Sequence, residues 1–218
     1  EMYSNTINYS ELKGHAIFKN RDNVKTVLMI VVTSDRGLAG GFNTNVLKEA
    51  QSTYDRYKRQ GVAVSLIACG KKACSYFKYR NIPTKLEYSG NSEDPRVRDA
   101  FEIGQVVYDG YTKETIDEVV CIFNFPKNNA EQNLVNIKLL PVSEQSLNSY
   151  LNPRVYNNEN AIKSKDKTNK FSGGSILFEP DETQVIDFLI QSYVRGLIYY
   201  MQTASSAAEQ GARMVAMQ

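Results

Sequence analysis

The chain has 218 residues, which is enough for one hydrophobic core with an extension, and its apolar content of 42% and charged content of 23% are ordinary for a globular protein. A net charge of +2 gives no reason to expect nucleic acid as a partner. No apolar run approaches the roughly 18 residues of a membrane-spanning helix, and no signal peptide opens the sequence, so direct membrane insertion is not expected.

Few side chains suggest metal or acid–base chemistry. Cys69, Cys74 and Cys121 each lie in or beside an apolar segment, which favours buried, reduced thiols over a zinc site. His15 is the sole histidine, and no nucleophile signature accompanies it, so we expect a surface side chain. The sequence therefore predicts no catalytic residue, no metal site and no cofactor.

The first two thirds of the chain alternate between strand and helix patterns. The pattern of residues 1–13 is typical of the frayed end of a helix, and the pattern of residues 14–147 predicts an α/β domain. Within it the expected strands are 24–33, 62–68, 83–88 (an edge strand), 118–125 and 134–142, and the expected helices are 44–60, 71–79 and one beginning at Ser92–Pro95. The last two strands are joined by a loop short enough for an antiparallel hairpin. The predicted fold is thus α/β, with a mixed, mostly parallel central sheet flanked by helices.

A glycine-rich turn, Thr33–Asn45, joins the first strand to the first full helix. Such a turn can cradle a phosphate at a helix N-terminus, and ligands of α/β sheets bind beyond the carboxyl ends of the strands. However, neither the dinucleotide-binding glycine pattern nor the P-loop pattern with its lysine is present. We therefore expect a structural turn, and keep as the alternative a small phosphate- or nucleotide-binding α/β enzyme that uses the Ser34–Asn45 loop.

The segment 148–181 predicts a polar connector, rich in lysine between Lys163 and Lys170. Its composition favours a solvated linker, and the alternative is a basic rim that contacts a partner or an anionic membrane surface.

The final segment, 182–218, carries the strongest helical pattern of the chain. Apolar and small residues recur there at alternating steps of four and three, the heptad spacing of a coiled coil. At 1.5 Å per residue the helix would be roughly 54 Å long, so we expect it to protrude from the domain and to pair with a long N-terminal helix of which residues 1–13 are the remnant. The predicted seam consists of Ile186, Ile190, Tyr193, Leu197, Tyr200, Ala204, Ala207 and Gly211.

Two motifs in this chain resemble those of one protein family. Ser34–Asn43, with the sequence SDRGLAGGFN, is similar to the signature found early in the gamma subunit of F-type ATP synthases. Glu209–Met217, with the sequence EQGARMVAM, resembles the C-terminal helix motif of the same family. Family members often have cysteine where Ala39 stands. The two motifs occur in the family's order, so the resemblance covers the chain from end to end.

The resemblance implies a rotor shaft rather than an enzyme. Gamma subunits turn inside a ring of alpha and beta subunits, contact the epsilon subunit and the membrane c-ring, and couple proton flow to ATP synthesis without a catalytic site of their own. It further implies a peripheral position on the membrane, with the cytoplasmic face of a bacterial inner membrane preferred to the mitochondrial matrix face. A coiled-coil adaptor unrelated to energy conversion is a third hypothesis. By resemblance, the expected partner-interface residues are Asp35, Arg36, Glu209, Gln210, Arg213 and Met214.

Overall fold

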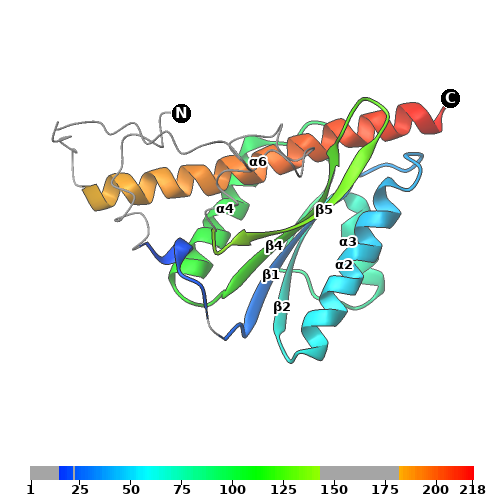
Figure 1. Ribbon diagram of the computed structural model, residues 1–218. Coiled ribbons are helices and arrows are strands. Elements are labelled where there is room, and N and C mark those ends of the chain that lie inside the picture. Colours follow the sequence, from blue (N-terminus) through cyan, green and yellow to red (C-terminus); the bar gives the residue numbers. More distant parts are fainter. Residues whose placement is uncertain (1–14, 22, 143–181) are drawn as a thin grey trace, which may run out of the picture.

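The computed structural model describes residues 15–21, 23–142 and 182–218. The predicted helix remnant at 1–13 and connector at 148–181 lie outside these residues. In the described part, a sheet lies between two layers of helices, and one long helix crosses the whole molecule (Figure 1). None of the described helices is both long enough and apolar enough to cross a membrane.

The sheet has five strands in the order β3-β2-β1-β4-β5. Four strands pair in parallel, and β5 pairs with β4 antiparallel as the second arm of a hairpin, so the predicted mixed, mostly parallel sheet is confirmed. The short β3 forms one edge, as expected. The strands span β1 Thr26–Val32, β2 Ala63–Cys69, β3 Leu86–Tyr88, β4 Glu118–Pro126 and β5 Gln132–Leu140.

Helices cover both faces of this sheet because its central strand is apolar on both sides. Leu28 and Ile30 of β1 pack toward α4 and α6, whereas Val27 and Met29 pack toward α2 and α3. Alternation along a strand sends successive side chains to opposite faces, so a continuous apolar run requires two covering layers. The helices are η1 Ala16–Phe18, α2 Phe42–Arg59, α3 Lys71–Tyr79, α4 Val97–Thr112 and α6 Glu182–Ala216.

The expected start of the fourth helix at Ser92–Pro95 is wrong. The helix α4 begins at Val97, and its N-cap residue Arg96 makes no side-chain capping bond. The polar residues before it serve the loop instead, because the hydroxyl of Ser92 accepts a hydrogen bond from the N–H of Asp35 at 2.8 Å.

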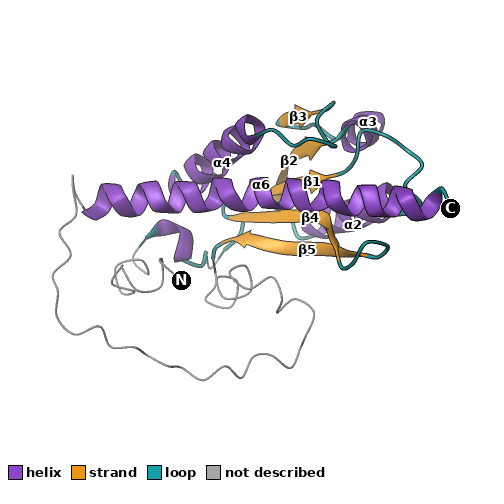
Figure 2. Ribbon diagram, turned by 90° about the horizontal axis from the view of Figure 1, so that it is seen from above, coloured by secondary structure: helices purple, strands orange, loops and turns teal. Residues whose placement is uncertain are grey.

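The predicted long C-terminal helix is confirmed as α6, although less of it protrudes than expected. The helix lies along the domain from Ile186 to Ala212, over α4 and the sheet, and its two ends reach past the strands (Figure 2). It does not leave the body until its last turn, where Met214–Gln218 are all exposed. The middle of the helix packs in turn on α4, on the sheet and on the loop after β1, and its ends extend beyond the sheet.

The stripe of α6 that the domain buries is offset from the predicted seam. It follows Ile186, Ile190, Val194, Ile198 and Met201, because a straight helix facing a sheet repeats every 3.6 residues rather than every 3.5. The seam residues are therefore divided. Ile186, Ile190 and Ala204 are buried, Tyr193, Leu197 and Gly211 are half-buried, and Tyr200 and Ala207 are exposed. Pairing of the exposed flank with another helix stays a prediction.

Candidate functional site

The two motifs that lie far apart in the sequence meet in the structure. Ala39 and Phe42 of the loop after β1 form one buried cluster with Ala208 and Ala212 of α6. The loop lies against the C-terminal end of α6, next to the tip of the β4–β5 hairpin (Figure 1). Alanine leaves room for the close approach of a loop backbone, so the small residues of α6 accommodate the chain's own loop. We call this contact the loop–helix junction.

The hairpin approaches the same stretch of α6 at Gly211. A Cβ atom added there would lie 2.7 Å from the carbonyl oxygen of Asn129, a distance that side chains do not tolerate against backbone. Gly211 is thus required by a contact within the chain. The small residues near the C-terminal end of α6 are therefore packed against two loops of the same chain.

A network of charges closes the junction. The Glu209 carboxylate is 1% exposed and accepts a hydrogen bond from the guanidinium of Arg213, four residues further along α6. Arg213 also donates to Oε1 of Glu93 at 3.0 Å, and Arg36 from the loop pairs with the same carboxylate oxygen at 3.0 Å. Glu93 therefore bridges the two arginines and joins the loop before α4 to both motifs.

Burial is the main cause that raises the pKa of Glu209 above its usual value. Arg213 opposes this shift through its charge and its hydrogen bond, and the nearby negative charges of Glu93 and Asp35 add to it. The carboxylate is consequently held by a single cation in an otherwise unfavourable setting.

Asp35 has the opposite electrostatic setting. Its carboxylate accepts hydrogen bonds from the backbone N–H of Lys71 at 2.8 Å and from that of Ser92 at 2.9 Å. Although burial on its own raises the pKa of Asp35, the N–H groups of Gly90, Ser92 and Lys71 together hold it below its usual value. Asp35 is therefore an internal anion that ties the N-terminus of α3 to the loop before α4.

The remaining free N–H groups at the start of α3 are also taken by the glycine loop and the end of β1. The N–H of Lys72 donates to the carbonyl of Ser34 at 3.1 Å, and the N–H of Ala73 donates to the hydroxyl of Thr33 at 2.9 Å. A phosphate would need these donors. The chain itself therefore fills the N-terminus of α3. The Ser34–Asn45 loop leads into α2, so these bonds do not test the phosphate- or nucleotide-binding alternative.

A small pocket lies beside the junction, between α6 and the carboxyl ends of β1 and β2. Its volume is about 30 Å³, which suits one or two water molecules and is far below that of a ligand site. Within the described chain, Oε1 of Gln202 has no hydrogen-bond partner, while its Nε2 donates to the sulfur of Cys69 at 3.8 Å. The lining includes Thr33, Cys69, Tyr88, Ser92, Gln202 and Glu209.

The predicted interface residues divide by exposure. Arg36, Gln210 and Met214 are exposed, whereas Asp35 and Glu209 use their carboxylates within the chain and Arg213 is half-buried. Sequence reasoning missed Glu93 because the Ser92–Pro95 stretch was interpreted as a helix start. The available signal was an acidic residue two positions before Pro95.

Comparisons with known proteins address the family directly. A family model described as ATP synthase matches residues 1–218, the whole chain. The chain belongs to the ATP synthase gamma family. The ATP synthase gamma chain of Alkaliphilus metalliredigens is 33% identical over 195 residues, with 89% of this chain and 61% of that protein covered. The gamma chain of Thermosynechococcus vestitus is 31% identical over 200 residues, with 89% and 64% covered. The chain thus spans less than two thirds of the length of these relatives.

Solved structures agree on the fold of this gamma-family chain. The central stalk and c-ring structure of the Tetrahymena thermophila mitochondrial ATP synthase contains a chain similar to it, with a TM-score of 0.63 and 22% identity, covering 96% of this chain and 84% of that one. A chain of the Euglena gracilis mitochondrial ATP synthase rotor gives a TM-score of 0.54 and 17% identity, covering 99% and 76%.

The titratable groups away from the junction have structural roles in this gamma-family fold. The prediction that His15 is a surface side chain is wrong. Its ring stacks on Tyr108, and its Nε2 lies 3.0 Å from Oδ1 of Asp187 on α6. The predicted burial is confirmed for Cys69 and Cys121, whereas Cys74 is only half-buried. Burial raises the pKa of the Cys69 thiol to about 12. Among the residues that the structure describes, no cluster of His, Cys, Asp or Glu is arranged to hold a metal ion.

Proposed function

We propose that this chain is the gamma subunit of an F-type ATP synthase, the rotor shaft that couples proton flow to ATP synthesis in a ring of alpha and beta subunits. Nucleotide chemistry belongs to that ring in this proposal, and the chain supplies no catalytic residue. The observation that carries the proposal is family membership over residues 1–218.

The mechanics of a shaft are consistent with how α6 is fastened. Apolar side chains attach its first half to the core, and the loop–helix junction attaches its second half. The domain and the helix would therefore turn as one body. Torque would pass from the domain to whatever surrounds the exposed last turn, from Met214 onward.

The interface residues then take two roles in the proposal. Arg36, Gln210 and Met214 are exposed and would contact the alpha and beta ring. Asp35, Glu209 and Arg213 would hold the junction in the shape that presents them. Contacts with the epsilon subunit and the c-ring belong to the same proposal, as does a peripheral position at the cytoplasmic face of a bacterial inner membrane, which the bacterial relatives support.

Single-molecule rotation of the assembled complex tests the proposal. A cysteine introduced at the exposed Ser52 on α2 can carry a bead, because Cys69 and Cys121 are buried and Cys74 is half-buried. ATP hydrolysis by the surface-fixed alpha and beta ring is expected to turn the bead in one direction. ATP hydrolysis with a stationary bead would contradict a shaft role. Micromolar binding of ATP to the isolated chain by calorimetry would instead favour the enzyme alternative.

A further inference from the structure

The α2–α3 side of the sheet carries a concentrated positive charge. Residues 42–85 contain nine basic and two acidic residues, a net charge of +7, so the rest of the chain, whose total is +2, has a net charge of −5. All nine basic side chains are exposed. We call them the basic face: Lys48, Arg56, Lys58, Arg59, Lys71, Lys72, Lys78, Arg80 and Lys85.

In the part of the chain that the structure describes, these nine cations are not paired with carboxylates, whereas several basic side chains on other elements are. On other elements, Arg21 pairs with Glu114, Lys138 pairs with Glu118, and Arg213 pairs with two glutamates. Within the described residues, no member of the basic face forms an ion pair. The stretch 71–85 contains no acidic residue.

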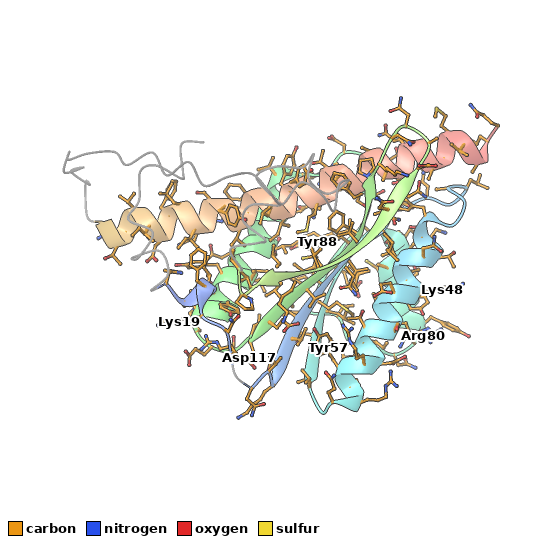
Figure 3. All side chains as sticks on the ribbon, viewed as in Figure 1. Lys19, Lys48, Tyr57, Arg80, Tyr88 and Asp117 are labelled. Atoms are coloured by element: carbon orange, nitrogen blue, oxygen red, sulfur yellow. The ribbon has the colours of Figure 1, made fainter. Side chains whose placement is uncertain are left out.

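Aromatic rings hold part of this face in place. The Arg80 guanidinium lies 4.7 Å from the centroid of the Tyr76 ring, and the Lys58 ammonium lies 5.8 Å from that of Tyr54. Such stacking restrains a cation while its N–H donors stay free for a carboxylate. Figure 3 shows Lys48 and Arg80 on the same side of the molecule, that of α2 and α3, and a hydrogen bond from Tyr76 to Gln51 joins the two helices there.

We propose that the basic face is a docking surface for an acidic protein segment, independently of the rotor function proposed above. Positive charge without internal carboxylates is complementary to Asp and Glu side chains, and a guanidinium restrained by a ring is suited to bidentate carboxylate binding. A lipid surface would be held better if several apolar side chains could insert. Among the large apolar residues of 42–85, Tyr79 is the one strongly exposed beside these cations, at 88%.

Charge reversal tests the surface on the chain itself. The probe is a fluorescein-labelled peptide of alternating glutamate and alanine, titrated by fluorescence anisotropy at low and at physiological salt. The variant Lys72→Glu/Lys78→Glu/Arg80→Glu is expected to weaken binding by about tenfold or more, because three attractive charges are replaced by three repulsive ones.

The matched control is Lys19→Glu/Arg98→Glu/Lys113→Glu, which changes the net charge equally at exposed positions outside the basic face. Its affinity for the peptide is expected to stay within about twofold of the parent chain. Equal weakening in both variants would overturn the proposal, and so would a parent chain that does not bind the peptide. Circular dichroism checks that both variants are folded.

Two further measurements identify the class of partner. Binding of the parent chain to phosphatidylserine vesicles or to a DNA duplex more tightly than to the peptide, and lost in the basic-face variant, would contradict a protein partner. In the assembled complex, carbodiimide is expected to link Lys71, Lys72, Lys78 or Lys85 to a carboxyl group of another subunit. Links confined to this chain would also overturn the proposal. The peptide titration needs no rotation, so its failure is distinguishable from failure of the rotor role.

Discussion

The two halves of α6 are held to the domain by different forces. From Ile186 to Met201 the helix buries large apolar side chains against α4 and the sheet, each worth about 1.5–3 kcal/mol. From Gln202 to Ala212 the buried residues are small or polar, and they contact two loops. The first half is therefore an anchor that depends on apolar area. The second half depends on close fit and charge, and is sensitive to residue size and to pH.

The largest expected effect breaks the anchor. Ile198→Ala removes a side chain that is fully within the apolar core, and should lower the free energy of unfolding by about 3 kcal/mol through lost burial and a residual cavity. The control Phe188→Ala, on the exposed side of the same half, should change it by less than about 0.5 kcal/mol. Urea unfolding followed by circular dichroism measures both. Similar losses in the two variants would mean that the first half is not the anchor.

Two glycines of α6, one in each half, test whether a side chain larger than hydrogen is tolerated there. Gly211→Ala places a Cβ against the Asn129 carbonyl and should destabilise the chain by about 1–3 kcal/mol. Gly196→Ala meets no atom within 4 Å and should stabilise it by up to about 1 kcal/mol, because alanine is the better helix former. Thermal unfolding of the pair gives the comparison directly. A stabilising Gly211→Ala would show that the hairpin does not press on the second half.

Asp35→Asn tests the loop that supports the second half. The two carboxylate oxygens accept from different N–H groups, and asparagine keeps one oxygen, so we expect a loss of about 1 kcal/mol at pH 7 after solvent screening. The folded-state pKa of Asp35 is lowered, so its stabilisation is present above the unfolded value of 3.8 and is lost as pH falls through the folded pKa. Urea unfolding at several pH values should therefore show that the parent chain and Asp35→Asn become equally stable in acid. Asp94→Asn, at an exposed carboxyl group nearby, is the control.

The smallest expected effect is at Glu209, whose contribution to stability changes with pH in the opposite direction to that of Asp35. The folded-state pKa of Glu209 is raised, so the folded chain binds this proton more tightly and the contribution of Glu209 to stability falls as pH rises from below 4.5 through the folded pKa. The free energy of unfolding of Glu209→Gln, relative to the parent, should thus improve with rising pH. Denaturant titrations across that window measure it. A relative stability that declines with pH would mean that Arg213 overcompensates the burial of Glu209.

Local pattern was enough for much of the fold. The apolar run from Val24 to Thr33 predicted a strand buried on both faces, the helix at Lys71–Tyr79 was predicted with its observed bounds, and the final hairpin was predicted as antiparallel. These elements are specified by periodicity and by turn residues within a few positions. The family motifs were equally readable, because they are contiguous stretches of sequence.

The loop–helix junction was not readable in the same way. Glu93 is bound by Arg36 and Arg213, which lie 57 and 120 residues from it, and no local pattern encodes such a meeting. The heptad spacing of α6 predicted a seam for another helix. A helix can bury more than one row of side chains, however, and the row that packs on the domain starts at Ile186 and continues through Val194 and Ile198.

By itself the sequence determined the elements, their alternation and the family, since each rests on residues close together in the chain. Tertiary structure alone decided which stripe of α6 is buried, that the small residues near Gly211 admit the chain's own loops, and that Asp35 serves as an internal anion. The physical reason is that burial and charge pairing depend on which residues pack against a given side chain. Those residues come from distant parts of the chain.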